Sequence, residues 1–363
     1  METIVRNAME REDHKKNKLD EELEKILQKQ RATIKVVGIG GAGNNTLNRI
    51  SEVGIVGIEA IAINTDAQDL LYTTADKKIL IGKDITKGLG AGSNPKIGEE
   101  AAKESENEIR EALKEADMVF ITCGLGGGTG TGAAPIVAEI SRKLGALTVG
   151  IVTLPFEVEG NARYENAMYG LRNLRKNVDT LIVIPNDKLL EIVPDMPLHT
   201  AFKVADEILT NAVKGIAEMV TRPGLVNLDF ADIRAIMNEG GVALIGVGES
   251  DSENRAIESV EKAINNPLID VDIRGASGAL VNISGGPSLT LDEAKKIVEY
   301  ITGKLDEDAK VIWGAQIYED LDKTIRTMVI VTGVKSPQIL SRDHLDEETR
   351  KEIESDLGIE FLD

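Results

Sequence analysis

Two glycine-rich turns and one pair of aspartates are the residues of this sequence whose types and spacing could do chemistry. The denser turn holds six glycines within the nine residues 124–132, which read GLGGGTGTG. A strand-like apolar run over Met118 to Cys123 precedes it, and a helix-like run over Ala133 to Leu144 follows, with Pro135 in the first turn. Because ordered glycine costs backbone entropy, such a cluster indicates that something must approach this backbone closely.

The other turn lies earlier in the chain, in the segment GIGGAGNN. Gly38, Gly40 and Gly43 form the pattern G-x-G-x-x-G between a strand-like run and a helix, which is the context that this pattern requires. Both turns would present bare N–H groups and a helix N-terminus to a phosphate. Neither has the lysine of a P-loop. Main-chain amides, the hydroxyls of Thr129 and Thr131 and a divalent cation are therefore expected to balance the phosphate charge.

Two other interpretations of the turns stay open at this point. The first pattern is also typical of dinucleotide-binding folds, in which Glu59 or Asp66 would be the acid that binds the ribose. A nicotinamide-dependent enzyme would need a proton-transfer residue, and none of His14, His199 and His344 lies in a loop at a strand end. Alternatively, the turns serve only the packing of helices on the sheet.

Asn227, Asp229 and Asp232 lie together in the segment NLDFAD. The three-residue spacing puts both carboxylates on one face of a helix that begins there. They could position and partly deprotonate a water that attacks a phosphate, or they could be the N-cap and the capping acid of that helix. A helical run of about 20 residues, roughly 30 Å long, precedes them. The aspartates are therefore expected at the face of the domain opposite the glycine turns.

An α/β pattern in two parts carries these residues. Strand-like and helical runs alternate up to residue 187, which predicts a Rossmann-type, parallel, doubly wound sheet with ligands at the carboxyl ends of its strands. A long helix over residues 199–220 and a smaller α+β domain of four strands and two or three helices follow. Strands are expected over residues 34–40, 58–66, 77–82, 118–123, 146–155, 180–187, 241–249, 278–286, 310–319 and 324–334, and helices over 44–53, 96–115, 254–264 and 291–305.

Composition excludes several classes of function. The formal net charge of −19 repels nucleic acid, and no apolar run approaches the roughly 20 residues of a membrane span. The single cysteine, Cys123, cannot form an internal disulfide, as is typical of a reducing cytoplasm. Residues 1–30 carry a narrow apolar stripe at helical spacing, which predicts a short helix resting on the body or, alternatively, a helix for a partner or a membrane.

At the denser turn a family resemblance emerges. Gly126 to Gly132, GGGTGTG, match the tubulin signature GGGTG[ST]G, and the sequence resembles the FtsZ family of prokaryotic, tubulin-like division GTPases. The resemblance extends, in order and spacing, through GIGGAGNN, INTD, AGSNP, IPNDKLL, TRPGLVNLDFAD and the second domain to about Val334. It implies a tubulin-like fold and the binding of GTP or GDP with Mg²⁺. The residues that it implies for nucleotide binding are Gly41, Ala42, Gly43, Asn44, Asn45, Asp66, Ala91, Gly92, Gly126, Gly127, Gly128, Thr129, Gly130, Thr131, Gly132, Glu159, Arg163, Asn186, Phe202 and Asp206.

The resemblance also assigns these residues to parts of the nucleotide. Residues 41–45 would form the first phosphate loop and residues 126–132 the main one, with Ala91 and Gly92 over the γ-phosphate. Glu159 would contact the ribose side together with Arg163, unless the two form only a surface ion pair. Guanine would lie near Asn186, Phe202 and Asp206. The Asp206 carboxylate can accept from both N1–H and the exocyclic amine of guanine. Phe202 could stack on the base or belong to the core.

FtsZ-like proteins stack head to tail, and the resemblance implies that Asn227, Asp229 and Asp232 of one subunit complete the GTP pocket of the next. Such a contact generates a filament, couples hydrolysis to assembly and places the protein at a cytoplasmic mid-cell division ring. A nucleotide-binding regulator without turnover is the remaining alternative, and the aspartate pair argues against it.

The implied organisation ends in a docking segment. It comprises an N-terminal helical extension (1–30), a GTP-binding domain (31–198), a central helix (199–222), an α+β domain (223–334) and an acidic tail (335–363). The last residues, Leu357 to Asp363, read LGIEFLD and resemble the peptide by which the family docks onto membrane-tethering adaptors and other division proteins. A frayed tail is the alternative. Neither membrane insertion nor nucleic-acid binding by the chain itself is expected.

Overall fold

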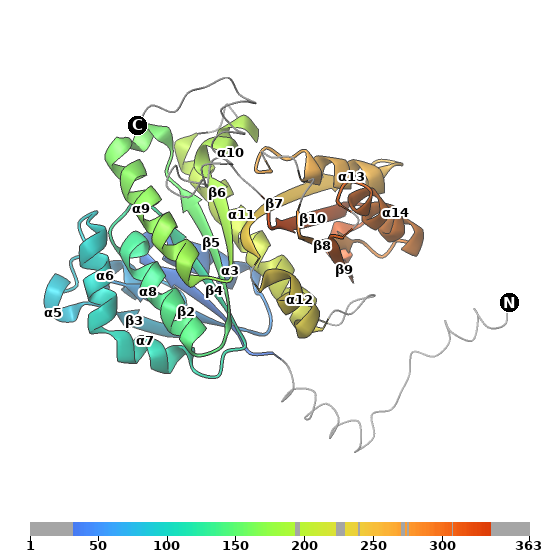
Figure 1. Cartoon of the computed structure of the whole chain (residues 1–363). Coiled ribbons are helices and arrows are strands. Elements are labelled where there is room, and N and C mark those ends of the chain that lie inside the picture. Colours follow the sequence, from blue (N-terminus) through green and yellow to red (C-terminus); the bar gives the residue numbers. More distant parts are fainter. Residues whose placement is uncertain are drawn as a thin grey trace, which may run out of the picture. The chain divides into compact units, whose positions relative to one another are not determined.

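A ten-stranded sheet runs through both predicted parts of the chain, in the order β3-β2-β1-β4-β5-β6-β7-β10-β8-β9 (Figure 1). The computed structural model describes residues 32–192, 197–222, 229–238, 240–269, 273, 276–306 and 308–334. The strands are β1 (Ile34–Ile39), β2 (Ile58–Asn64), β3 (Lys77–Leu80), β4 (Met118–Gly124), β5 (Leu147–Leu154), β6 (Thr180–Pro185), β7 (Gly241–Ser250), β8 (Gly278–Gly285), β9 (Lys310–Ile317) and β10 (Ile325–Thr332). These strands confirm the α/β prediction.

The first six strands are parallel and have the order 3-2-1-4-5-6. This is the order of doubly wound nucleotide-binding sheets, in which the ligand crevice opens where the strand order reverses, here between β1 and β4. Three residue pairs, from Thr180↔Gly241 to Ile182↔Ala243, join β6 to β7 in parallel. Only β10 is antiparallel to its neighbours β7 and β8.

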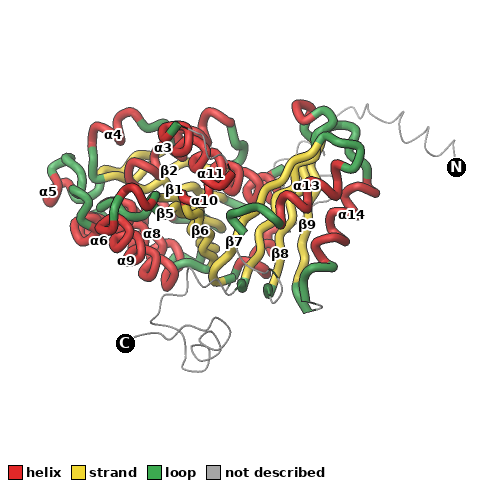
Figure 2. The backbone as a smooth tube through the Cα atoms, turned by 90° about the horizontal axis from the view of Figure 1, so that it is seen from above, coloured by secondary structure: helices red, strands yellow, loops and turns green. Residues whose placement is uncertain are grey.

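Helices cover both faces of the parallel part of the sheet. The helices of the described residues are α3 (Gly40–Val53), α4 (Ala67–Tyr72), α5 (Lys83–Thr86), α6 (Pro95–Glu104), α7 (Glu106–Leu113), α8 (Thr129–Lys143), α9 (Asn161–Asn177), α10 (Asn186–Ile192), α11 (Leu198–Thr221), α12 (Phe230–Met237), α13 (Arg255–Ile264) and α14 (Leu291–Thr302). Figure 2 shows α3 and α11 on one face of the sheet, and α6, α8 and α9 on the other. Each face has its own buried apolar cluster, and a third cluster packs α13 and α14 on the C-terminal strands.

Three helix predictions need correction. The helices after the glycine turns begin inside the turns, α3 at Gly40 and α8 at Thr129, so Pro135 lies in the second turn of α8 and not in its first. Sequence periodicity could not locate these starts because glycine carries no hydrophobic signal. The single helix expected over residues 96–115 is two helices, α6 and α7, which meet at Ser105. The long helix is confirmed as α11.

Several expectations lie outside the described residues. They are the helix of the N-terminal extension, the position of Asn227 and the conformation of the tail with Leu357 to Asp363. Among the described residues, no helix combines the length and apolar composition needed to cross a bilayer.

Candidate functional site

Both glycine turns open into one cleft of about 310 Å³ at the carboxyl edge of the parallel strands. Its walls come from the ends of β1, β4, β5 and β6, from the starts of α3 and α8, and from one side of α11. Of the predicted residues, the cleft is lined by Gly41, Ala42, Asn45, Gly127, Gly128, Thr129, Gly130, Glu159, Arg163, Asn186, Phe202 and Asp206. It is also lined by residues that were not among the predicted nucleotide-binding residues, namely Ile39, Gly40, Gly124, Leu125, Thr153, Pro155 and Ala205.

At two positions that line the cleft, neither packing nor the backbone conformation requires a glycine. A Cβ built on Gly127 would meet no atom within 4 Å, and one built on Gly41 would meet only the Asp69 carboxylate, at 3.9 Å. Neither residue has a positive φ. The absence of side chains here leaves room for a ligand to reach the backbone, as a phosphate cradle requires.

Other glycines of the turns are required by packing. A Cβ on Gly43 would lie 2.4 Å from the Thr122 carbonyl oxygen, and one on Gly132 would lie 1.9 Å from the Pro95 carbonyl oxygen. Packing therefore explains some of the glycines in the two turns and does not explain Gly41 and Gly127.

The two predicted threonines have different surroundings. Thr129 lines the cleft, and its hydroxyl lies 2.6 Å from that of Thr65 at the end of β2. Thr131 is fully buried, and its hydroxyl accepts a 2.8 Å hydrogen bond from the N–H of Gly126. The Thr131 side chain thus stabilises the turn from within, because it satisfies a donor that a tight glycine turn would otherwise leave unpaired.

Three more of the predicted nucleotide-binding residues, Asp66, Ala91 and Gly92, are not among those that line the cleft. Asp66 is the N-cap of α4, where its Oδ1 accepts the N–H groups of Gln68 and Asp69. Ala91 is buried, and a Cβ on Gly128 would lie 2.7 Å from its own. Gly92 has a φ of +55° and open space around it.

Asp69 is a candidate site residue that sequence reasoning missed. Its Oδ2 accepts hydrogen bonds from the amides of Asn44, at 2.9 Å, and Asn64, at 2.6 Å. Both asparagines are buried, so the carboxylate ties the first turn of α3 to the end of β2. A carboxylate three residues after INTD gives no sequence signal, because its two partners are 5 and 25 residues away.

The other end of the cleft is aromatic and acidic. Phe202 is 40% exposed and packs edge-on against Phe156, with ring centroids 5.2 Å apart. Burial raises the pKa of Asp206 to about 6, although the Thr46 hydroxyl, 3.4 Å away, opposes the shift. The amide oxygen of Asn186 is buried and has no partner within the described chain. An unpaired buried acceptor and a desolvated carboxylate suit a ligand that brings hydrogen-bond donors.

Glu159 and Arg163 form the ion pair that their spacing predicts, with Nη1 and Oε2 2.7 Å apart. The Glu159 carboxylate also accepts the N–H of Phe156 at 2.9 Å. Both side chains line the cleft, so the pair is not merely a surface pair remote from the site.

The aspartate pair lies at the opposite edge of the sheet. Asp229 is the N-cap of α12, its Oδ1 accepts the N–H of Asp232 at 2.8 Å, and both residues are exposed. The guanidinium of Arg234 in the same helix donates to the carbonyl of Gly145, just before β5 begins, at 2.7 Å. The cleft lies at the far end of β5, at Thr153. Eight residues of strand separate the two edges by roughly 26 Å.

The capping alternative therefore describes the geometry of the aspartates correctly. Capping uses one carboxylate oxygen of each residue, Asp229 Oδ1 and Asp232 Oδ2. The exposed carboxylates can also reach a molecule outside this chain, so capping does not exclude a second role.

Comparisons with known proteins agree with this architecture. Residues 33–194 match the family model for the GTPase domain of the Tubulin/FtsZ family, and residues 241–335 match the model for the FtsZ C-terminal domain. The fold and the cleft are thus those of a GTPase of the tubulin class.

Individual relatives narrow the assignment. Cell division protein FtsZ 1 of Thermococcus kodakarensis is 63% identical over 343 residues, which cover 93% of this chain and 92% of that protein. The protein of the same name from Pyrococcus furiosus is 60% identical over 359 residues, 96% of each chain. A solved empty FtsZ dimer from M. jannaschii superposes with a TM-score of 0.85 at 61% identity, over 88% of this chain and 93% of that one. The chain belongs to the FtsZ family, and these matches displace the nicotinamide-dependent alternative.

Proposed function

We propose that this chain binds and hydrolyses GTP in the cleft and that hydrolysis requires head-to-tail assembly. The observation that carries the proposal is the separation of the cleft from α12, the helix that begins at the aspartates. The cleft opens at the carboxyl end of β5 and α12 is hydrogen-bonded just before its amino end, and the strand between these two ends is roughly 26 Å long. One copy alone would therefore hold both halves of the hydrolytic site, but at places too far apart to act together.

The phosphates are assigned to the glycine turns. Residues 41–45 and 126–132 would hold them through main-chain N–H groups and the N-termini of α3 and α8, with Ala91 and Gly92 near the γ-phosphate. The open space at Gly41 and Gly127 supports this assignment. Mg²⁺, when bound, would offset the phosphate charge. It commonly takes one or two carboxylates with phosphate oxygens and waters, so the absence of a larger acidic cluster among the described residues is compatible with it.

The base and ribose are assigned to the opposite end of the cleft. The Asp206 carboxylate can accept from N1–H and the exocyclic amine of guanine, whereas adenine offers no such pair of donors. The exposed ring of Phe202 can stack on the base. Glu159 and Arg163 would contact the ribose side.

Asn227, Asp229 and Asp232 would act in the neighbouring subunit, where they would position and partly deprotonate the attacking water. A contact between two different surfaces of identical subunits does not close on itself, so it produces a filament. That the similar M. jannaschii structure is an FtsZ dimer supports self-association.

A mixing experiment tests this proposal. Asp232→Ala should bind GTP normally and hydrolyse it very slowly. Gly127→Val should retain the aspartates but block the cleft. In a 1:1 mixture, about a quarter of the interfaces would pair an intact cleft with intact acids, so phosphate release should recover toward that fraction. A mixture as inactive as its components, or an active Asp232→Ala, would contradict the shared site.

The cellular role is proposed from the family. We infer that the filaments act in a cytoplasmic division ring at mid-cell and that Leu357 to Asp363 bind a membrane-tethering adaptor or other division proteins. Deletion of these seven residues should leave GTP hydrolysis and sedimentation with GTP intact and abolish adaptor binding. Unchanged binding would remove this part of the proposal.

A further inference from the structure

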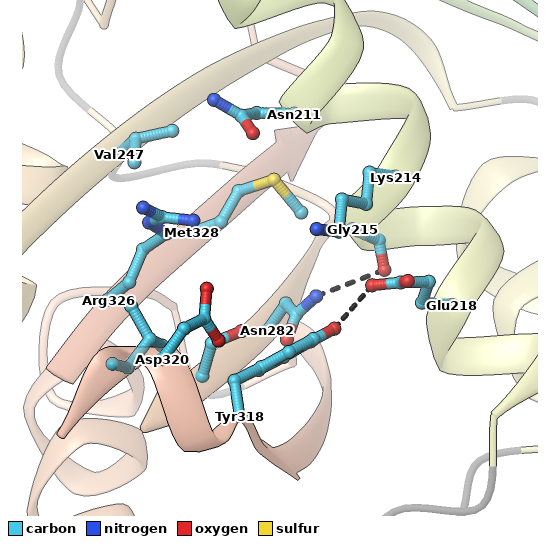
Figure 3. Close-up of a pocket in the computed structure, with 12 residues that line it drawn as sticks. Asn211, Lys214, Gly215, Glu218, Val247, Asn282, Tyr318, Asp320, Arg326 and Met328 are labelled. Atoms are coloured by element: carbon cyan, nitrogen blue, oxygen red, sulfur yellow. Dashed lines mark hydrogen bonds between the residues drawn. The ribbon is translucent and has the colours of Figure 1, made fainter. Parts of the chain in front are cut away.

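Tyr318, just after β9, contacts two side chains of the long helix α11, Lys214 and Glu218 (Figure 3), and that of its C-cap, Arg222. The three residues are spaced four apart, so they form a row along one side of α11 and its C-terminal end. The Tyr318 hydroxyl donates to Glu218 Oε2. The Lys214 ammonium lies 5.4 Å from the centre of the Tyr318 ring and the Arg222 guanidinium 5.6 Å, both within cation–π range.

The contact with Tyr318 is important because the Glu218 carboxylate is buried. The residue is 1% exposed, and a buried carboxylate is costly unless it is paired and hydrogen-bonded. Its partners are the Tyr318 hydroxyl and Arg222 Nε, 3.3 Å from Oε1. Burial and the Glu218 carboxylate both raise the pKa of Tyr318, so the phenol remains a donor at neutral pH. A shift of α11 against the C-terminal strands would leave the carboxylate without this donor.

A second contact fixes the same part of α11. The Asn282 amide of β8 donates to the carbonyl of Gly215 at 3.0 Å. A Cβ on Gly215 would lie 2.1 Å from Met328 Cε of β10, so the strands pack directly against the helix backbone. The row therefore lies beside direct contacts between α11 and the C-terminal strands.

The same helix links the two halves of the proposed site. Phe202 and Asp206, in its first half, line the cleft, and Asp229 follows its end at Thr221 by eight residues. The position of α11 along its axis therefore affects both halves.

We propose that Tyr318 is a positioning residue for GTP hydrolysis. By pairing with Glu218 it sets the position of α11 against the C-terminal domain and hence that of the aspartates presented to the next subunit. This inference rests on the proposed function, since it concerns the same shared site.

The test compares two removals of a tyrosine hydroxyl. Tyr318→Phe removes the donor to Glu218, whereas the control Tyr300→Phe removes a hydroxyl bonded to Glu261, 3.2 Å away, without contact to α11. In the full chain, Tyr318→Phe should lower kcat about tenfold, because the lost hydrogen bond to a charged group no longer holds α11 in place. Its KM and its GDP affinity should stay close to those of the parent, whereas its melting temperature should fall, since the buried Glu218 carboxylate loses a donor. Tyr300→Phe should have the parental kcat, and all rates are compared well below the melting temperature of each variant.

Three outcomes separate the possibilities. Parental kcat in folded Tyr318→Phe overturns the positioning role, as does a loss of kcat that is matched by weaker GDP binding. If folding of this variant is impaired, Lys214→Gln removes one cation from the ring and should lower kcat alone, by a smaller factor. Asp232→Ala in the same assay tests the proposed function separately: an active Asp232→Ala refutes the shared site, whereas an inactive one with fully active Tyr318→Phe refutes only this inference.

Discussion

Arg234 is hydrogen-bonded to the carbonyl of Gly145, and this contact fixes α12 at the amino edge of the parallel strands. The cleft opens at the carboxyl edge of the same strands. The helix α12, which begins at the aspartates, thus lies at the other end of the parallel strands from the only glycine turns within the described chain that could hold a triphosphate (Figure 1). The proposed hydrolytic site therefore requires a second copy of the chain.

The rate of phosphate release per molecule should therefore depend on protein concentration. We expect almost no turnover in dilute solution and a rise above a threshold, because only assembled subunits share a complete site. Phosphate release and sedimentation, measured on the same dilution series with GTP, check this. A rate per molecule that stays constant on dilution would indicate a site contained in one chain.

The two roles of Asp232 can be separated by substitution. Its side chain accepts the N–H of Asp229 at 3.4 Å, and an asparagine keeps an acceptor there but carries no charge. Asp232→Asn should therefore lose turnover while it retains the parental melting temperature. Asp229→Ala removes the N-cap and should also cost about 1 kcal/mol of unfolding free energy. If Asp232→Asn hydrolyses GTP at the parental rate, the aspartate is only a capping residue.

GDP affinity should fall in mild acid because of Asp206. Its pKa in the empty protein is raised to about 6, and guanine needs the ionised carboxylate as acceptor. Affinity should thus be lost as the pH falls through 6 and should be about tenfold weaker at pH 5 than at pH 7.5. Equilibrium titration with GDP measures this. Asp206→Asn should bind GDP weakly and without this pH dependence, and a parental pH dependence in that variant would locate the titrating group elsewhere.

The same carboxylate affects folding with a defined sign. Because the folded-state pKa lies above the ordinary value of 3.8, the empty native protein holds more protons than the unfolded chain between about pH 4 and 6. This residue's contribution to stability is therefore lost as the pH rises through that range. Urea unfolding of the empty protein measures this. Between pH 4.5 and pH 6.5, the decrease in unfolding free energy should be smaller in Asp206→Asn than in the parent.

The sequence predicted the sheet and both glycine turns because buried parallel strands are continuous apolar runs and glycine clusters are rare. It could not predict Asp69, whose partners are Asn44 in α3 and Asn64 at the end of β2. Nor could it predict the pairing of Tyr318 with Glu218, which are 100 residues apart. Such contacts depend on how elements pack, and a single sequence carries no local signal for them.

Gly127 and Gly132 allow the ligand and packing roles of the glycine cluster to be tested side by side. A methyl group at Gly127 would meet nothing within 4 Å, so Gly127→Ala should fold with the parental melting temperature and yet bind GDP at least about tenfold more weakly, since the methyl group stands where phosphate oxygens must approach. A methyl group at Gly132 would lie 1.9 Å from the Pro95 carbonyl oxygen, so Gly132→Ala should lose about 3 kcal/mol or more of unfolding free energy. Thermal melts with and without GDP distinguish the two. Parental GDP affinity in Gly127→Ala would show that no ligand reaches this backbone, and the assignment of the phosphates to the turn would then be wrong.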